Sequence, residues 1–317
     1  MKIFRFSHIP ILIVLIAILM ACKSNPTLTE GEGYIEVTGG KIWYHIIGEG
    51  NETPILFLHG GPGGTSKSFY NFAELSVDRP VILFDQLGSG RSDYHTDTTL
   101  MTVEIFVEQL EQLKNALNLK EYYLYGHSWG GLLGLAYYLE HPEHMKSLIF
   151  GSPLISTPLW ISDADTLLTS LHDSLQSVIQ ISIKNGDFNS IEYLQAESVF
   201  YDNFILRTSR IKSKYDTVPK ESNRTIYKYM WGPSEFISTG TLKNYDLSNR
   251  LSEIEIPTLF ITGEFDEARP STVKSFRSQV PNSEFVVIEG AGHATMHDNL
   301  KDNINAIKDF IDKIEDK

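Results

Sequence analysis

The chain has 317 residues, with 27 basic and 40 acidic side chains and a formal net charge of −13. This acidic balance argues against binding to nucleic acid, and against binding to anionic lipid through surface charge. The length fits one large α/β domain, or one such domain that carries an insertion. Cys22 is the only cysteine, so the chain has no internal disulfide.

The chain opens with the pattern of an export signal. Lys2 and Arg5 precede an apolar run over residues 9–20, which is shorter than the roughly 20 residues that a helix needs to cross a bilayer. We therefore expect residues 1–21 to be a signal peptide. Residues 22–33 are polar, and we expect them to form a flexible tether.

The end of this signal, Leu19-Met20-Ala21-Cys22, resembles the lipoprotein box of bacteria, in which the cysteine is lipidated and becomes the mature N-terminus. The resemblance implies a protein that is exported and anchored through Cys22 to a bacterial membrane, at its periplasmic face or at the cell surface. A plain signal peptide cut near Ala21, which leaves a free thiol, is the alternative.

The following segments alternate between strands and helices. Two alternating runs flank Thr38-Gly39-Gly40 and predict a hairpin over residues 33–47. Helical spacing predicts a helix over Met101–Leu117 and a last helix from about Asp298. Continuous apolar runs are typical of strands buried on both faces of a parallel sheet. Such runs occupy residues 54–58, 80–84, 145–150, 256–261 and 284–288.

The pattern changes over residues 154–245, where helical stretches rich in Ser, Asp, Tyr and Phe replace the strands. We therefore predict an α/β fold with a mostly parallel, doubly wound sheet, formed by residues 34–153 and 246–317. Residues 154–245 are expected to form a helical cap. Because ligands bind beyond the carboxyl ends of the strands in such sheets, we expect the cap to cover the site.

The most informative motif is Gly126-His127-Ser128-Trp129-Gly130. An aromatic-rich run that reads as a strand precedes it, and a helix that ends before Pro142 follows it. A Gly-x-Ser-x-Gly motif on a strand-to-helix turn is the nucleophile elbow of a serine hydrolase. The turn is so sharp that a Cβ at Gly126 or Gly130 is expected to collide with neighbouring backbone. Ser128 is therefore the candidate nucleophile.

A serine nucleophile needs a base, and the base needs an orienting acid. In this fold the acid and then the base follow the serine along the chain, each on a loop after a strand. His293 follows the strand that ends at Ile288 through a Gly-Ala-Gly loop, and it is the candidate base among ten histidines. Asp266 follows the strand that ends at Ile261 and is the preferred acid. Glu264 and Glu267 compete for that role.

The oxyanion hole is expected to use the amide of Trp129, directly after the nucleophile, and one amide from the loop after an earlier strand. His59-Gly60-Gly61-Pro62-Gly63-Gly64 has the glycines for such a loop, and Gly61 is the candidate donor. A phosphate-binding loop is the competing interpretation. It fails because the run has neither a Gly-Lys-Ser/Thr ending nor Gly-x-Gly-x-x-Gly spacing.

Taken together, these motifs resemble the prolyl aminopeptidase (proline iminopeptidase) family of α/β-hydrolases. The resemblance runs from about Gly33 to the C-terminus and implies the α/β-hydrolase fold. It is carried by His59-Gly60-Gly61-Pro62-Gly63, Asp85-Gln86-Leu87-Gly88-Ser89-Gly90-Arg91-Ser92, Gly126-His127-Ser128-Trp129-Gly130-Gly131, Gly263-Glu264-Phe265-Asp266 and Gly290-Ala291-Gly292-His293.

The cap run Met230-Trp231-Gly232-Pro233-Ser234-Glu235-Phe236 is similar to the tricorn-interacting-factor branch of that family. That branch trims short peptides, with proline favoured but not required. The resemblance implies that Glu235 and Glu267 hold the α-ammonium of the substrate, and that Tyr227 assists. Without the surrounding motif, Glu235 would be read as a solvated surface glutamate.

The leading hypothesis is a serine aminopeptidase that acts on short peptides with a free N-terminus, through an acyl-enzyme on Ser128. A carboxylesterase, or another acyl hydrolase such as a lactonase, could use the same triad. A lipid-anchored binding protein on a decayed hydrolase scaffold is the third hypothesis, but the complete Ser-Asp-His set argues against it. We expect no metal and no cofactor, since the sequence has no His-Glu-x-x-His motif and no cysteine cluster.

Overall fold

A computed structural model describes residues 25–211 and 222–316 of the chain. The expected signal peptide and the lipidation site Cys22 lie outside these described residues. The expectation of a flexible tether over residues 22–33 is wrong from Asn25 onwards, because this stretch is packed on the domain. Asn25 is buried, its side-chain oxygen accepts hydrogen bonds from the amides of Lys120 and Glu121, each 2.9 Å long, and β1 already begins at Gly31. In the part of the chain that the structure describes, no helix has the length and apolar composition to cross a membrane.

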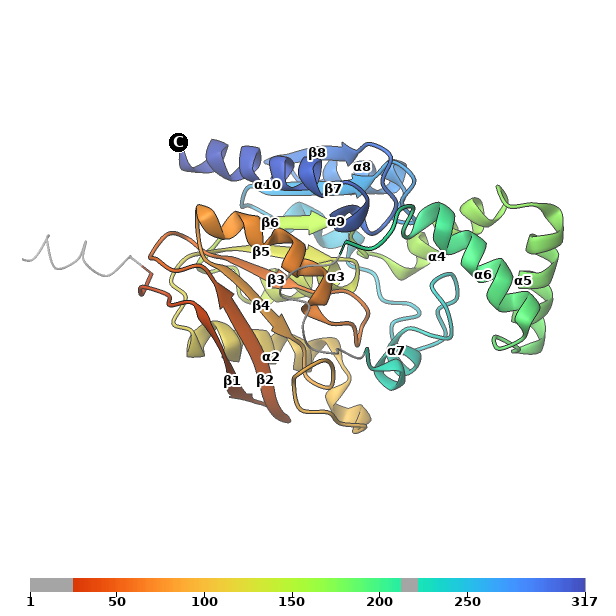
Figure 1. Ribbon diagram of the computed structural model, residues 1–317, viewed down its shortest axis with the longest axis horizontal. Coiled ribbons are helices and arrows are strands. Elements are labelled where there is room, and N and C mark those ends of the chain that lie inside the picture. The colour runs from red at the N-terminus through yellow and green to blue at the C-terminus, as the bar shows by residue number, and fades with distance from the viewer. Residues whose placement is uncertain (1–24, 212–221, 317) are drawn as a thin grey trace, which may run out of the picture.

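One sheet of eight strands forms the centre of the described chain, in the order β1-β2-β4-β3-β5-β6-β7-β8 (Figure 1). The first two strands form the predicted antiparallel hairpin, β2 pairs antiparallel with β4, and all further pairs are parallel. The strands are β1 (Gly31–Val37), β2 (Gly40–Ile47), β3 (Ile55–Leu58), β4 (Val81–Asp85), β5 (Tyr122–His127), β6 (Met145–Gly151), β7 (Thr258–Gly263) and β8 (Ser283–Ile288).

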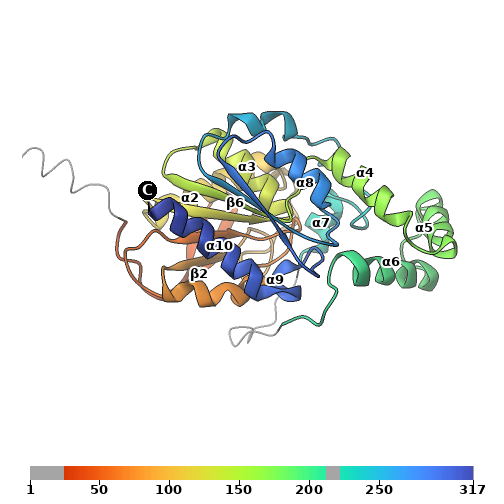
Figure 2. The same ribbon diagram turned by 90° about the horizontal axis from the view of Figure 1, so that it is seen from above.

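Helices cover both faces of this sheet (Figure 2). Successive strand residues point to opposite faces, so Leu56 and Leu58 of β3 pack in one apolar cluster, and Ile55 and Phe57 pack in the other. The first cluster includes α2 (Val103–Ala116), α3 (Trp129–Glu140) and α8 (Pro270–Arg277). The second cluster includes the 3-10 helix η1 (Ser66–Val77), α9 (Thr295–Asp298) and α10 (Leu300–Glu315).

The predicted insertion lies between β6 and β7, and its helices project beyond the edge of the sheet on the right of Figure 1. A third apolar cluster holds it together, with Phe200, Tyr193 and Phe236 at its centre. A bridge between Ser156 and Asp246 brings its two ends side by side. The helices of the insertion are α4 (Thr157–Leu168), α5 (Asp173–Asn185), α6 (Ile191–Phe204) and α7 (Arg224–Met230).

The predicted doubly wound sheet with a helical insertion is therefore confirmed. The predicted strands are displaced from the observed ones by no more than two residues at any end. Two short 3-10 helices, η2 (Thr98–Leu100) and η3 (Ser248–Glu253), lie in connecting segments. The division at residues 153/154 and 245/246 remains a prediction, and so does a cap that covers the site.

Candidate active site

Ser128 lies between β5 and α3 with backbone angles of φ 56° and ψ −124°, a region that L-residues rarely adopt. Its neighbours must be small. A Cβ at Gly126 would lie 2.3 Å from the carbonyl oxygen of Gly130, and a Cβ at Gly130 would lie 2.2 Å from that of Leu58. The turn therefore has the geometry expected of a nucleophile elbow, and it presents Ser128 at the carboxyl end of the sheet.

His293 and Asp266 meet at the same end of the sheet. Nδ1 of His293 lies 2.9 Å from Oδ1 of Asp266, and both side chains are buried. Asp266 also accepts hydrogen bonds from the hydroxyl of Thr262 and from the amides of Gly263 and Ala268. Burial alone would raise the pKa of Asp266, but the His293 ring and these hydrogen bonds lower it, so Asp266 is ionised and orients His293.

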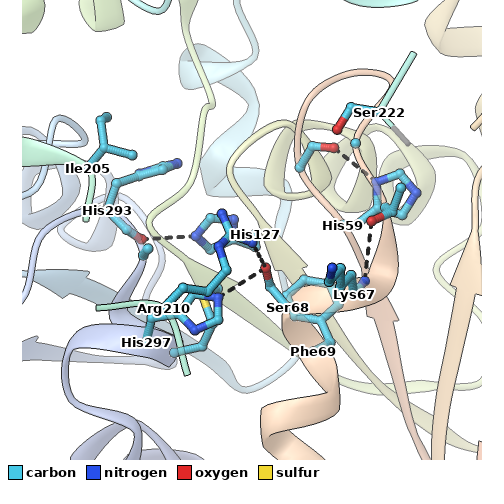
Figure 3. A pocket seen from close by; sticks show the side chains of 15 residues that line it. His59, Lys67, Ser68, Phe69, His127, Ile205, Arg210, Ser222, His293 and His297 are labelled. Atoms are coloured by element: carbon cyan, nitrogen blue, oxygen red, sulfur yellow. Dashed lines mark hydrogen bonds between the residues drawn. The ribbon is translucent and has the colours of Figure 1, made fainter. Parts of the chain in front are cut away.

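His127 connects the elbow to His293. Its Nε2 lies 3.0 Å from the carbonyl oxygen of His293, and the two rings are 4.6 Å apart (Figure 3). Burial and the neighbouring His293 lower the pKa of His127 to about 3, so the ring is neutral and donates this hydrogen bond. The residue before the nucleophile therefore holds the backbone of the candidate base.

The loop that carries Gly61 is fixed from two sides. Gly61 has φ +122°, a conformation that favours glycine. Asp85 accepts hydrogen bonds from the amide and hydroxyl of Ser66, at the far end of the loop. Gln86 donates to the carbonyl of His59 and accepts from the indole of Trp129, so it joins the loop to the elbow.

The amide of Trp129 begins α3, where the first N–H groups of a helix have no acceptor within the helix. A Cβ at Gly60 would lie 3.0 Å from Cβ of Ser128, so the glycine loop approaches the nucleophile closely. The amides of Gly61 and Trp129 thus lie on two segments that meet at Ser128. Such a pair of amides can stabilise an oxyanion.

Glu267, the neighbour of the triad acid, carries a buried carboxylate. The side chain is 1% exposed, and neither carboxylate oxygen has a hydrogen-bond partner among the described residues. Its Oε1 lies 3.8 Å from Nε2 of His293. Burial, together with the charges of Glu235 and Asp266, raises the pKa of Glu267 well above its usual value. A carboxylate in this position favours the arrival of a cation.

The second predicted amine ligand, Glu235, comes from the segment expected to form the cap. It lies close enough to Glu267 and His293 for their charges to interact. Burial raises the pKa of Glu235, whereas Tyr227, His293 and Tyr201 act in the opposite direction. The hydroxyl of Tyr201 lies 3.4 Å from Oε1 of Glu235. Burial and the charge of Glu235 raise the pKa of Tyr227 well above its usual value, so its hydroxyl keeps its proton.

The backbone of the motif around Glu235 explains how this residue comes to lie so near to His293. The indole of Trp231 donates to the carbonyl of Ser234 over 2.8 Å, and Ser234 forms a bridge with Ile237. At Gly232, which has φ +158°, a Cβ would lie 2.4 Å from the carbonyl oxygen of Ile237. The segment is a compact turn that places Glu235 near Tyr201 and His293.

Sequence reasoning missed residues of α6. Tyr201 contacts Glu235, and the hydroxyl of Tyr193 donates to Glu197 over 3.1 Å. Burial and the charge of Glu235 raise the pKa of Glu197, which makes it a third carboxylate at this place. The spacing of residues 193, 197 and 201 by four places them on one helix face, which was the available signal.

The end of α6 also fixes the histidine loop. The amide of His293 donates to the carbonyl of Phe204 over 2.8 Å, and the amide of Ala294 donates to that of Ile205 over 2.7 Å. Asp298 accepts hydrogen bonds from the amides of Arg207 and Gly292. The cap and the candidate base are therefore joined through the backbone.

The roles predicted for Ser128, Asp266, His293, Gly61, Trp129, Glu235, Glu267 and Tyr227 are chemically compatible with these positions. The fold is that of an α/β-hydrolase with a candidate serine nucleophile. Among the described residues, no group of three or more His, Cys, Asp or Glu side chains is arranged to hold a metal ion.

Comparisons with known proteins agree with this class. Residues 53–300 match the family described as the alpha/beta hydrolase fold. A proline iminopeptidase of Heyndrickxia coagulans is 42% identical over 285 residues, which cover 89% of this chain and 99% of that protein. The chain belongs to the α/β-hydrolase fold family and, within it, to the proline iminopeptidases.

Solved structures give the same result. The crystal structure of a proline iminopeptidase of Mycobacterium smegmatis has a TM-score of 0.80 and 27% identity, and the match covers 90% of this chain and 98% of that one. The crystal structure of VinJ has a TM-score of 0.83 and 27% identity, over 90% of this chain and 99% of that one. Both solved proteins therefore share the fold of this chain over nearly their whole length.

Proposed function

We propose that the protein is a serine aminopeptidase that releases N-terminal residues from short peptides. Ser128 attacks the first peptide carbonyl, while His293 takes the hydroxyl proton and then gives it to the leaving amine. Asp266 orients His293 and stabilises its charged form. The amides of Gly61 and Trp129 stabilise the oxyanion, and water then releases the acyl-enzyme.

The observation that carries this proposal is the buried carboxylate of Glu267, which lies 3.8 Å from His293 and has no hydrogen-bond partner among the described residues. Burying a carboxylate without a hydrogen-bond partner is costly, so this site stabilises a ligand that brings a positive charge. The α-ammonium of a peptide is such a charge, and in the scissile residue it is two bonds from the carbonyl that Ser128 attacks. Glu235 provides a second negative group, and the pair sets the distance from the N-terminus to the nucleophile.

The alternative, a carboxylesterase or lactonase with the same triad, makes no use of these carboxylates. An acyl group without an amine would have to bury itself against Glu267, where it offers no compensating charge. The acid pair therefore favours the aminopeptidase over the esterase.

The experiment compares 7-amido-4-methylcoumarin derivatives of proline and alanine, each with a free and with an N-acetylated amine. Cleavage of the free-amine substrates alone, abolished in Ser128→Ala, is the expected result. Glu267→Gln and Glu235→Gln should lower kcat/KM for free-amine substrates by about 10²-fold, since each removes a charge-assisted contact of roughly 2–3 kcal/mol. Equal cleavage of acetylated substrates, or turnover of p-nitrophenyl esters alone, would favour the esterase.

We further propose the broader specificity of the tricorn-interacting-factor branch, with proline favoured but not required. Trp160 of α4 lies edge-on to His293, with ring centroids 5.4 Å apart, and Trp231 lies edge-on to Trp160. Aromatic rings beside the reacting carbonyl provide an apolar wall for the first side chain, and a flat wall accepts proline and other apolar residues. The ratio of kcat/KM for proline, alanine and glutamate substrates tests this breadth.

A lipid anchor on Cys22 is also proposed, from the sequence pattern of residues 1–22. It makes the protein an exported lipoprotein on a bacterial membrane, with peptides as its substrates there. Metabolic labelling with an alkynyl fatty acid should mark the wild-type protein, and Cys22→Ala should abolish both the label and recovery in the membrane fraction. An unlabelled wild-type protein in the soluble fraction of the periplasm or medium would instead indicate the plain signal peptide.

A further inference from the structure

The turn that follows β6 holds the backbone of the candidate nucleophile. This turn, residues 151–154, begins at the last residue of the strand and lies at the carboxyl end of the sheet. The amide of Ser128 donates to the carbonyl of Gly151, and the amide of Leu154 donates to the carbonyl of Ser128, each over 3.1 Å. The backbone of Ser128 is therefore hydrogen-bonded to this turn on both sides.

Ser152, in the middle of this turn, has an unusual backbone conformation. Its φ is +49°, in the left-handed region that residues other than glycine rarely adopt, and the residue is fully buried. Its amide donates to the carbonyl of Ile261 in β7 over 2.7 Å. A strained residue persists only where its surroundings fix it, and such residues gather at functional sites. The side chain of Ser152 is therefore a candidate for a functional contact.

The hydroxyl of Ser152 reaches both the candidate base and the candidate acid. It donates to the carbonyl of His293 over 3.2 Å, and the same carbonyl accepts from Nε2 of His127 (Figure 3). Burial would raise the pKa of Asp266, whereas the ring of His293 and hydrogen bonds, one of them from the Ser152 side chain, lower it. Because a hydroxyl has one proton, it donates to one of these acceptors at a time. Ser152 thus contacts two members of the triad, and its turn holds the third.

We infer that Ser152 is a positioning residue, whose hydroxyl keeps the acid and the base of the triad in place relative to Ser128. The inference rests on the proposed mechanism of the triad, but not on the amine site or on the kind of substrate. Ser152 is fully buried, so it acts through His293 and Asp266 and not on the substrate. Proton transfer is sensitive to small displacements of the base, and a hydroxyl that holds the backbone of the base limits them.

Loss of this hydroxyl should slow catalysis without weakening substrate binding. In Ser152→Ala the carbonyl of His293 keeps its hydrogen bond from His127, so it is not left without a partner, but its second support is removed. We expect kcat to fall by roughly threefold to tenfold, which is the range of one hydrogen bond. KM should stay within about twofold of the wild-type value, since Ser152 does not meet the substrate.

The test measures two rates, one of which needs no peptide substrate. The first is kcat for alanine 7-amido-4-methylcoumarin, and the second is the rate at which a fluorophosphonate probe labels Ser128, which requires an activated serine but no amine. Both rates should fall in Ser152→Ala. The matched control is Ser147→Ala, at a serine of β6 that is equally buried and whose hydroxyl has no hydrogen-bond partner among the described residues. Both rates should stay at the wild-type level in this control.

Ser152→Gly separates a loss of activity from a loss of stability. Glycine favours the positive φ, so this variant should melt at a higher temperature than Ser152→Ala, yet it should show the same slower rates. Wild-type rates in either Ser152 variant, an equal fall in Ser147→Ala, or a rise in KM at constant kcat would overturn the inference. A wild-type protein that is labelled but leaves the coumarin substrate uncleaved would overturn the proposed function, and the labelling rates would still test the role of Ser152.

Discussion

Oε1 of Glu267 lies 3.8 Å from Nε2 of His293, so the candidate base and a buried carboxylate that has no hydrogen-bond partner among the described residues share one wall of the site. A carboxylate so close to the base has two consequences for catalysis. It attracts the substrate amine to the place where the proton is transferred, and it stabilises the imidazolium that forms when Ser128 attacks. The same group is unfavourable for folding when no substrate is bound.

The raised pKa of Glu267 predicts a loss of stability as pH rises. An unfolded glutamate has a pKa of about 4.3, whereas burial, Glu235 and Asp266 hold the folded pKa well above that value. Between the two values the folded protein holds more protons than the unfolded chain, so the free energy of unfolding falls with increasing pH.

Glu267→Gln should therefore melt at a higher temperature than the wild type at pH 8, and the difference should narrow towards pH 5. Thermal melts across this range measure the effect, with Glu255→Gln, an exposed glutamate, as the control. A difference that does not vary with pH would show that the charge of Glu267 is not its source.

Asp266→Asn should lower kcat by about 10⁴-fold with little change in the fold. The carboxylate accepts from the amides of Gly263 and Ala268 as well as from His293, and an amide group cannot accept at all of these positions. Steady-state kinetics on a free-amine coumarin substrate measure the loss. Glu264→Gln should keep kcat within a few-fold, because Glu264 is exposed and accepts only from the amide of Gly290 in the described structure. The reverse order of effects would assign the acid to Glu264.

Substitution by alanine should have different effects on stability at two glycines of α3, the helix that follows Ser128. At Gly130 the new Cβ would lie 2.2 Å from backbone of Leu58, so Gly130→Ala should lower the melting temperature strongly or prevent folding. At Gly134 the nearest atoms are leucine methyls at 3.4 Å or more. Gly134→Ala should be neutral or stabilise by up to about 1 kcal/mol, since alanine favours a helix. Similar melting temperatures for the two variants would contradict the close approach of α3 to β3.

Tyr201→Phe should raise KM for free-amine substrates by roughly threefold to tenfold and leave kcat nearly unchanged. The lost hydroxyl is a hydrogen-bond partner of Glu235 and helps to hold its carboxylate in place, and such a bond contributes about 0.5–1.5 kcal/mol. Michaelis–Menten kinetics on alanine and proline coumarin substrates provide the measurement. Tyr229→Phe, at a more exposed tyrosine outside this cluster, is the matched control. A fall in kcat without a change in KM would place Tyr201 in the chemical step instead.

The sheet and the triad could be predicted because both depend on local patterns. Apolar runs such as 54–58 and 256–261 are typical of strands buried on both faces of a parallel sheet, and the chain order then places the loops after β5, β7 and β8 at the same end of that sheet. Ser128, Asp266 and His293 are each identified by the few residues around them. Their convergence at one edge follows from the topology.

Contacts between the insertion and the histidine loop could not be predicted in this way. The hydrogen bonds from His293 and Ala294 to the carbonyls of Phe204 and Ile205 join backbone groups about 90 residues apart, and backbone groups leave no trace in side-chain patterns. The cluster of Tyr193, Glu197 and Tyr201 depends on how α6 packs on the core. A role for this cluster can be inferred only once the structure shows that Tyr201 contacts Glu235.

The hydrogen bonds of Asn25 determine how an anchored protein would be oriented. Asn25 is tied to Lys120 and Glu121, just before β5 begins, whereas Ser128 follows the other end of that strand, about 20 Å away. A lipid on Cys22, three residues before Asn25, would attach the molecule near the amino ends of the parallel strands. Ser128 lies at the opposite, carboxyl end of these strands. Ser128 would then lie at the end of the molecule away from the membrane, and the enzyme would collect diffusing peptides and not the ends of proteins embedded in the same bilayer.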